Sequence, residues 1–162
     1  DRPLSRGLGD VYKRQPFQVG LINLALSFIG SKAPQALLRA AESDVAEVRV
    51  AAISALGDQI QTLGDTDAQK KVFEALEDTS PDVRAEAVTL IGKSCDAEDV
   101  QELLIKRLAD SDSQVRKNSA MALMKLEAKG TINALSTAEQ SESDKDVQAV
   151  INVAIKILSN KE

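Results

Sequence analysis

The sequence has no histidine, no tryptophan and a single cysteine, Cys95, among its 162 residues. The absence of histidine excludes histidine metal ligands, histidine general bases and Ser-His or Cys-His nucleophile pairs. One cysteine can form neither an intrachain disulfide nor a thiolate metal cluster. A lone cysteine such as Cys95 is typically a small buried apolar side chain, and a reactive thiol is the alternative. We therefore predict no catalytic residue, no metal site and no cofactor.

Aromatic residues, long apolar runs and an excess of positive charge are also missing. The chain has three Phe and one Tyr, and 20 Lys and Arg against 25 Asp and Glu, for a net charge of −5. Proteins that bind single-stranded nucleic acid need basic grooves with stacking aromatics, so we expect no nucleic-acid partner. The longest apolar run, within residues 21–30, is too short and interrupted to span a bilayer. We expect a soluble, cytoplasmic protein with no membrane partner.

The first fifteen residues differ from the rest of the chain. Residues 5–15, SRGLGDVYKRQ, resemble in unbroken order the translation of a transposase-type sequencing adapter. Residues 1–15 are thus expected to be a non-native, disordered segment, and the sequence to be a fragment of a longer protein; the alternative is a natural basic arm. The segment contains four basic and two acidic residues, so the remaining chain has 16 basic and 23 acidic residues.

A short motif recurs along the chain. EVRVAAISALG begins at Glu47, DVRAEAVTLIG at Asp82 and QVRKNSAMALM at Gln114, and a weaker copy, DVQAVINVAIK, begins at Asp146. The valines of these motifs are separated by 35, 32 and 32 residues. Self-similarity at this period indicates a protein built of stacked repeats.

Apolar residues recur at three- and four-residue steps, which predicts helices throughout. We predict a repeat domain over residues 16–162, with a half repeat at 16–30 and repeats at about 33–62, 66–94, 97–128 and 130–160. The predicted helices are 17–29, 34–42, 46–60, 67–77, 81–93, 97–109, 113–128, 131–140 and 145–159. The turns are rich in Ser and acidic residues, which favour helix N-caps, and Ser80 before Pro81 is the clearest example. We expect the extra length after Leu56 to form a longer connection between repeats.

The second helix of each pair carries a stripe of large, small and large residues. Positions zero, four and eight of the motif lie on one helix face. They are Val48, Ala52 and Leu56 in the first unit, Val83, Ala87 and Ile91 in the second, Val115, Ser119 and Leu123 in the third, and Val147, Ile151 and Ile155 in the fourth. The small central residue should let the partner helix approach closely, and each pair should bury a face on both neighbours.

The Val-Arg pair, preceded by an Asp-rich turn and followed by Ala and then Leu or Ile, resembles the HEAT repeat. The short period resembles the bacterial HEAT-like repeats of phycobilisome lyases. This resemblance implies an all-α fold, an α-α superhelix (solenoid) of stacked antiparallel helix pairs, HEAT- or armadillo-like. It is weak as a signal of function, because such repeats serve unrelated tasks. The fourth unit departs from the pattern, with Gln148 in place of Arg.

Arg49, Arg84 and Arg116 occupy the same position in three units. They could form an anion-binding row along a groove. The alternative, which we favour, is a structural ladder of ion pairs with turn carboxylates such as Asp78 and Asp110, because buried polar groups need partners.

The exposed side of the second helices is the candidate binding surface. The resemblance implies that these helices line the concave face, on which we predict a modestly basic strip; a merely solvated face is the alternative. The candidate residues on this strip are Lys93, Lys117, Asn118, Met121, Lys125 and Lys156.

Two functions from different classes remain. The first is a non-catalytic scaffold that binds a protein or peptide partner on the concave face. The second is a subunit of a phycobilin lyase or a related chromophore-handling protein. Whether the chain is an enzyme stays open, with a non-catalytic role favoured. The last helix, over residues 147–158, is apolar on most sides, whereas a capping repeat should have a polar outer face. We expect it to contact another chain or a segment beyond the sequence, and self-association through exposed terminal repeats is one option.

Overall fold

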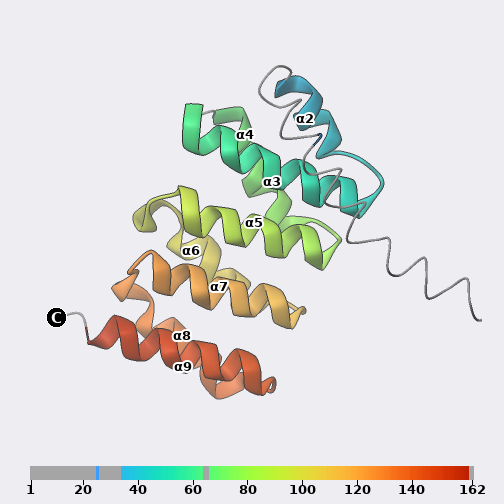
Figure 1. Cartoon of the computed structure of the whole chain (residues 1–162). Coiled ribbons are helices and arrows are strands. Elements are labelled where there is room, and N and C mark those ends of the chain that lie inside the picture. The colour runs from blue at the N-terminus through green and yellow to red at the C-terminus, as the bar shows by residue number, and fades with distance from the viewer. Residues whose placement is uncertain (1–24, 26–33, 64–65, 161–162) are drawn as a thin grey trace, which may run out of the picture.

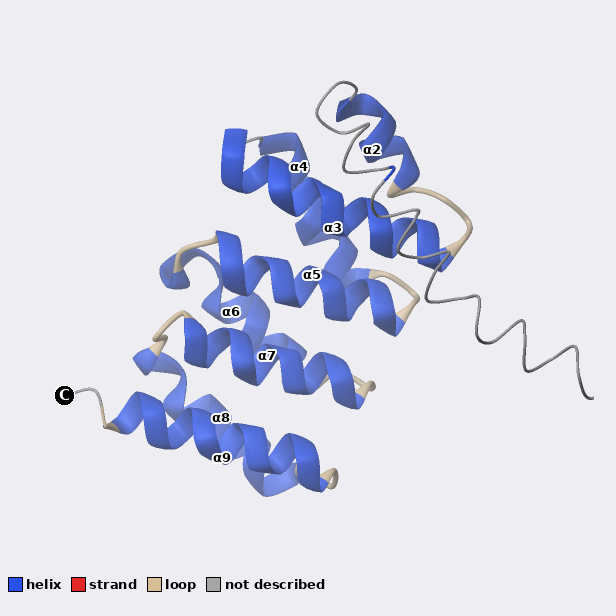
Figure 2. Cartoon of the chain, in the orientation of Figure 1, coloured by secondary structure: helices blue, strands red, loops and turns tan. Residues whose placement is uncertain are grey.

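The described part of the chain folds into four helix pairs. The computed structural model describes residue 25, residues 34–63 and residues 66–160. The pairs are α2 (Pro34–Ala40) with α3 (Ala46–Leu63), α4 (Thr66–Glu74) with α5 (Pro81–Ser94), α6 (Ala97–Arg107) with α7 (Ser113–Lys125), and α8 (Ile132–Ser141) with α9 (Lys145–Ser159). Two short 3-10 turns, η1 (Ala75–Glu77) and η2 (Lys129–Thr131), follow α4 and precede α8. The described residues contain no strand, which confirms the all-α prediction (Figure 2).

The second helices lie side by side in chain order. Helix α3 packs on α5, α5 on α7 and α7 on α9, while each first helix packs behind its partner (Figure 1). This arrangement is the predicted solenoid. The expected adapter-derived segment at 1–15 lies outside the described residues, and so does the half repeat at 16–30 apart from residue 25. No helix in the described ranges is both long enough and apolar enough to cross a membrane.

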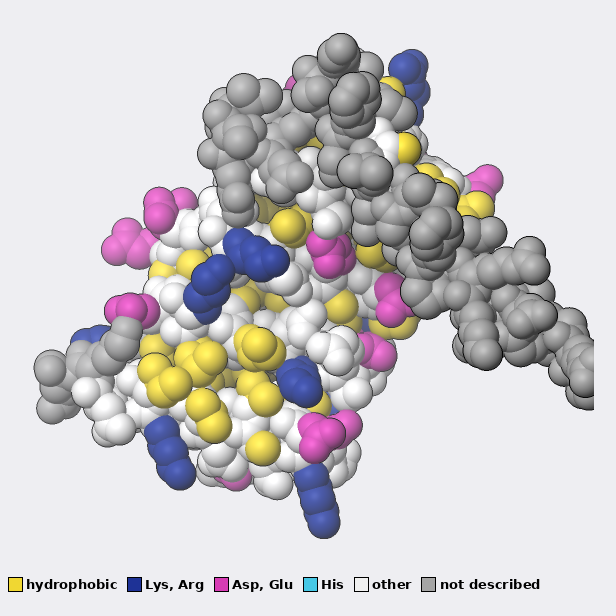
Figure 3. Space-filling model, in the orientation of Figure 1, with side chains coloured by type: hydrophobic (Ala, Val, Ile, Leu, Met, Phe, Trp, Pro, Cys, Tyr) yellow, Lys and Arg dark blue, Asp and Glu magenta, His cyan; other side chains and the backbone are white. Residues whose placement is uncertain are grey.

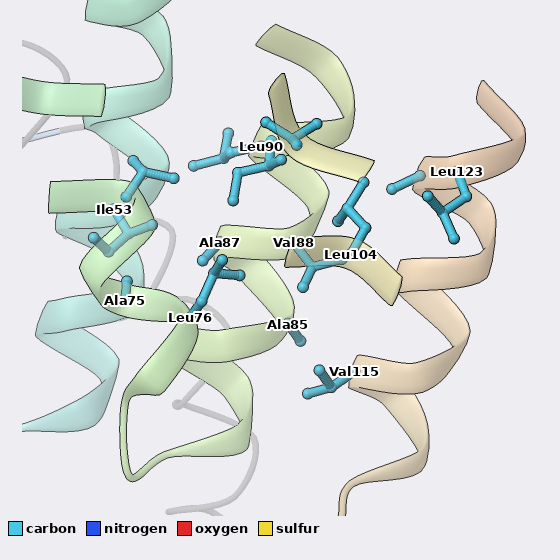
Figure 4. Close-up of a cluster of buried hydrophobic side chains, with 14 of the residues drawn as sticks. Ile53, Ala75, Leu76, Ala85, Ala87, Val88, Leu90, Leu104, Val115 and Leu123 are labelled. Atoms are coloured by element: carbon cyan, nitrogen blue, oxygen red, sulfur yellow. The ribbon is translucent and has the colours of Figure 1, made fainter. Parts of the chain in front are cut away.

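The predicted stripe forms the core. The valine at position zero is buried in the second, third and fourth units. The central residue, at position four, is buried in all four units, and the large residue at position eight is buried in the first three. The two ends of the stripe, Val48 and Ile155, are partly exposed. Ile53, Val88 and Leu104 extend this core from one repeat to the next (Figure 4). The core therefore runs through all four pairs, because each pair buries a face on its neighbour.

Two glycines let neighbouring second helices approach closely. Gly57 on α3 faces the Leu90 side chain on α5, and Gly92 on α5 faces Ala122 on α7. A Cβ atom at Gly92 would lie 2.6 Å from the Cβ of Ala122, well inside van der Waals contact. The absent side chain at Gly92 thus sets the spacing between α5 and α7.

Two local predictions were wrong. The extra length after Leu56 does not form a connection. It extends α3 to 18 residues, against 14 in α5, because residues 57–63 contain no proline and Gly57 is accommodated inside the helix. Ser80 makes no side-chain capping bond to α5. Its own backbone N–H donates instead to Asp78 Oδ1 at 2.8 Å, so the Asp78 side chain orders this turn. True side-chain caps occur at α7 and α9, through Asp112 and Asp144.

Candidate functional site

The arginines that recur at one position of the motif form rungs that join successive repeats. Arg84 on α5 donates from Nε and Nη2 to the two carboxylate oxygens of Asp110, at 2.9 and 2.7 Å. Its Nη1 donates to the carbonyl oxygen of Asp78, in its own repeat's turn, at 2.9 Å. Arg49 repeats the arrangement with Asp78, at 2.8 and 2.7 Å, and with the Ser43 carbonyl. Each guanidinium therefore fixes the turn before its own helix and the turn of the next repeat.

A third rung uses a residue that the sequence reasoning missed. Arg116 donates to both carboxylate oxygens of Glu142, at 2.7 and 2.9 Å, and to the carbonyl of Asp110. These bonds, against an opposing contribution from burial, lower the pKa of Glu142 to about 2. In the fourth unit Gln148 reaches only the Glu139 carbonyl, at 3.5 Å. In each of the three arginines Nε, Nη1 and Nη2 all donate to acceptors within the protein, and the side chain is only 12–16% exposed, which leaves little of it accessible to an external anion.

The rungs also shift the titration of their carboxylates and connect to a buried arginine. At Asp110, desolvation raises the pKa, but the bonds from Arg84 and from the Asp112 backbone N–H outweigh it, and the net shift is downward.

Arg107 on α6 lies 3.6 Å from the Asp110 carboxylate and donates to Glu77 and to the Leu76 carbonyl of the preceding repeat. This network holds the second and third repeats together at two points.

The second-helix face, the outward surface of α3, α5, α7 and α9, carries the predicted strip (Figure 3). Lys93, Met121, Lys125 and Lys156 are exposed there, and Lys117 is half-buried. Four of the candidates come together around one hollow: Lys93, Asn118, Met121 and Lys125 line a shallow pocket of about 280 Å³ between α5 and α7. Lys117 and Lys156 do not line this pocket.

The floor of this α5–α7 pocket is apolar. It is lined by Met121, Met124 and Ala122, together with Gly92 and Thr89, and the two lysines stand at equivalent positions of neighbouring repeats. The hollow exists because neither Gly92 nor Ala122 has a side chain large enough to fill it. It combines an apolar surface with two cationic groups.

Asn118 is a structural cross-link between two repeats. Its Nδ2 donates to the Ala85 carbonyl at 3.1 Å and to Thr89 Oγ1 at 3.0 Å, both on α5. Its Oδ1 accepts from Gln114 Nε2 at 2.6 Å. The amide is thus used within the protein, and it stands between the α5–α7 pocket and a second hollow, both of which it lines.

The second hollow is acidic. It has a volume of about 360 Å³ and is lined by Glu47 on α3, by Asp82 and Glu86 on α5, and by the apolar side chains of Val50 and Ala85. The second-helix face therefore changes sign along its length, from acidic near the start of α3 and α5 to basic near the end of α5 and α7. This polarity also complements the helix dipoles, because acids lie at the N-terminal ends and lysines at the C-terminal ends.

The lysines on the two sides of the solenoid differ in their pairing. On the first helices, Lys71 pairs with Glu42 and Glu74, and Lys106 pairs with Glu77 at 2.7 Å. On the second-helix face, Lys93, Lys117, Lys125 and Lys156 form no ion pair with any residue that the structure describes. These four ammonium groups are available to an external anion.

The described residues offer little for catalysis. They contain no group of three or more Cys, Asp or Glu side chains arranged to hold a metal ion. Burial raises the pKa of the Cys95 thiol, and the Gln69 amide lies 3.9 Å from its sulfur. A raised pKa disfavours the thiolate, so Cys95 is not an activated nucleophile.

Comparisons with known proteins agree with this architecture. A family model described as HEAT repeats matches residues 69–156, so the chain belongs to the HEAT-repeat family. The chain is 46% identical over 138 residues to the bilin biosynthesis protein MpeU of Synechococcus sp. (strain WH8020). This match covers 85% of the chain and 46% of MpeU, so the chain spans about half the length of that relative.

Two solved structures share the fold. One is a designed armadillo repeat protein in complex with the peptide (KR)4, with a TM-score of 0.55 and 26% identity, over 75% of this chain and 62% of that chain. The other is an engineered protein with a TM-score of 0.53 and 24% identity, over 76% of this chain and 61% of that chain. Both matches cover less than two thirds of the solved chains.

Proposed function

We propose that this HEAT-repeat chain is part of a bilin-handling protein, and that a bilin binds in the α5–α7 pocket. The identity to a bilin biosynthesis protein supports the ligand class, and the apolar pocket with two unpaired lysines supports the place. The pocket is the observation that carries the proposal, since an apolar surface and two unpaired lysines line the same hollow.

The chemistry of a bilin matches this combination. A bilin is a linear tetrapyrrole, with a flat conjugated body and two propionate groups. The conjugated body would cover Met121, Met124 and Ala122, and thioether side chains adapt well to such flat ligands. The propionates would pair with Lys93 and Lys125, whose equivalent positions lie on helices that pack about 8–10 Å apart.

The pocket would hold only part of such a ligand. Its volume of about 280 Å³ lies near the lower end for ligand pockets. The remainder of a bilin would lie along the second-helix face, and this chain would hold and present the chromophore. The proposal also keeps the expected cytoplasmic location, which subcellular fractionation would test.

The test is a titration of the purified chain with biliverdin as the probe, followed by absorbance. We expect a saturable spectral shift, and at least about tenfold weaker binding in the double variant Lys93→Glu/Lys125→Glu, because each substitution replaces attraction by repulsion. Lys70→Glu, at an exposed lysine on α4, is the control and should bind as the parent does. No saturable shift, or equal loss in the control, would contradict the proposal.

A peptide-binding scaffold is the second candidate. The acidic hollow favours it, because Glu47, Asp82 and Glu86 make no ion pair with a described residue, and a protein of similar fold is solved with the basic peptide (KR)4. Fluorescence anisotropy with labelled (KR)4 tests it. Binding should be salt-sensitive and should be lost in the Asp82→Lys/Glu86→Lys variant; an unaffected variant would exclude this hollow as the site.

A further inference from the structure

Three exposed apolar side chains form a patch on the last two second helices. Met121 on α7 is 46% exposed, and Val153 and Ile157 on α9 are 49% and 39% exposed. In the space-filling view, hydrophobic side chains gather over this end of the second-helix face, with Lys and Arg side chains around them (Figure 3). We call these three residues the α7–α9 patch.

The repeat itself does not require this patch. Met121 and Val153 occupy the position six residues after the motif valine, where α3 has Ser54 and α5 has Thr89. Ile157 occupies the position ten residues after it, where α5 and α7 have lysines. Polar residues therefore serve equally well at these positions for stacking. The apolar residues are confined to one end of the face.

A following repeat in the same register would not explain the patch either. In the preceding units, positions five and nine of the motif face neighbours and are apolar: Ile53, Val88 and Ala120 are buried, and Gly57 and Gly92 touch the next helix. In α9 these positions are the exposed polar residues Asn152 and Lys156. Burying them under another pair would cost desolvation free energy. The expectation that α9 is apolar on most sides is therefore wrong at the edge where stacking occurs.

Lysines surround the patch. Lys117 and Lys125 lie one helical turn before and after Met121, and Lys156 follows Val153 by three residues, so all three reach its border. None forms an ion pair within the part of the chain that the structure describes. An apolar centre with a polar rim is the usual anatomy of a protein interface. The rim is positively charged although the chain has a net charge of −5, and a positive rim favours a partner with an acidic surface.

The patch suits a helix better than an extended peptide. An extended peptide needs partners for its backbone N–H and C=O groups, whereas a helix satisfies its own. Asn118, three residues before Met121 on this face, already uses its amide in bonds to Ala85, Thr89 and Gln114. Helices α7 and α9 pack side by side, and their exposed side chains form ridges against which another helix can pack.

We propose that the α7–α9 patch binds an amphipathic helix of a partner protein whose apolar side is flanked by carboxylates. Met121 and Lys125 also line the α5–α7 pocket, but Val153 and Ile157 do not, so substitutions at Val153 and Ile157 test this proposal separately from bilin binding. A second copy of this chain is a poorer occupant. A two-fold contact through the patch would set its lysine rim against the same rim in the other copy.

The probe is a labelled synthetic peptide of about five helical turns, with Leu at i, i+3, i+4 and i+7, Glu on both flanks and Ala elsewhere. We expect saturable binding by anisotropy that weakens as salt is added. The same peptide with Lys in place of Glu should bind at least about tenfold more weakly, since it meets like charge. A version with a central Pro, which breaks the helix, should also lose most of its binding.

Matched variants locate the site. Val153→Ser/Ile157→Ser should weaken binding about tenfold, while Leu103→Ser, at an exposed leucine of α6, should leave it unchanged. Lys117→Glu and Lys156→Glu should each weaken it several-fold, and Lys70→Glu should not. Biliverdin titration of Val153→Ser/Ile157→Ser should match the parent, so that loss of one activity is distinguished from loss of the other.

Three outcomes would overturn the proposal. Equal binding of the Glu and Lys peptides, or binding that the patch substitutions leave unchanged, would show that the contact is nonspecific. The third comes from sedimentation velocity: a dimer that Val153→Ser/Ile157→Ser dissociates would assign the patch to a second copy of the chain.

Discussion

Removal of the Arg84 side chain tests how strongly the rungs couple the repeats. Arg84 is 12% exposed and its partner Asp110 only 4%, so this ion pair is largely buried. Breaking a buried pair by removing one partner costs about 3–5 kcal/mol, because the other charge stays buried. In Arg84→Ala, Asp110 keeps its bond from the Asp112 N–H, and Arg107 at 3.6 Å can move closer. We therefore expect a loss of about 2–4 kcal/mol in the free energy of unfolding.

Urea unfolding followed by far-UV circular dichroism at neutral pH measures this loss. The midpoint should fall markedly. The slope m should also decrease if the second and third repeats begin to unfold separately, because repeat stacks depend on contacts between neighbours. Lys106→Ala is the control: its bond to Glu77 also joins neighbouring repeats, but both side chains are about two-thirds exposed, so no measurable change is expected.

A double variant separates the cost of an orphaned charge from the worth of the pair. Arg84→Met/Asp110→Leu removes both charges and should recover part of the loss, since replacing a buried pair by apolar groups is often neutral. Recovery should be incomplete because the Asp112 N–H loses its acceptor. The reasoning fails if Arg84→Ala lowers the midpoint no more than Lys106→Ala does, with m unchanged.

Three further predictions concern pH, helix spacing and capping. The folded-state pKa of Glu142, about 2, lies below its ordinary value of 4.5, so its stabilisation is present above pH 4.5 and is lost as the pH falls toward 2; urea midpoints across this range should decline, and less so in Glu142→Gln. Gly92→Ala should lower the free energy of unfolding by about 1–2 kcal/mol, because the added methyl group pushes α5 away from α7, and this outweighs the better helix propensity of Ala. Gly130→Ala is the control and should be near neutral in the same assay, because its Cβ atom would lie 3.7 Å from the nearest atom, Gln101 Oε1. Asp112→Ala should cost about 1 kcal/mol in thermal unfolding, since its side chain accepts from two backbone N–H groups of α7, while Ser80→Ala, which removes no cap bond, should change little; equal effects would contradict the assigned caps.

The repeat made the architecture predictable from the sequence, because the same apolar spacing occurs four times and each occurrence supports the others. The motif stripe, with Leu56 and Ile91 as examples, lies in the core. Glu142 was missed because it is a longer carboxylate than Asp78 and Asp110, although it too precedes its motif valine by five residues. An alignment of the turns on those valines would have found it.

The features that the sequence did not predict depend on contacts between repeats. Periodicity placed Asn118 on the second-helix face, but its use as a cross-link required Ala85 and Thr89 to lie opposite it. The pocket beside it depends on two small residues, Gly92 and Ala122, meeting across two helices. Likewise, several residues with side-chain oxygens precede α5. The path of the turn decides that the Asp78 side chain, and not that of Ser80, accepts a backbone hydrogen bond there.

The rungs bear on how a chain of this kind can change its length. Each joins an Arg to a carboxylate of the next turn, and in the last two rungs the two residues stand 26 positions apart. Deletion of the residues from Val83 to just before Val115 would put Arg116 in the place of Arg84, with Glu142 as its partner at the same separation. Duplication of these residues would add a rung of the same kind. The ion pairs therefore do not distinguish these units from one another, whereas the sizes of the packed side chains do, because Gly57 packs against Leu90 and Gly92 against the smaller Ala122.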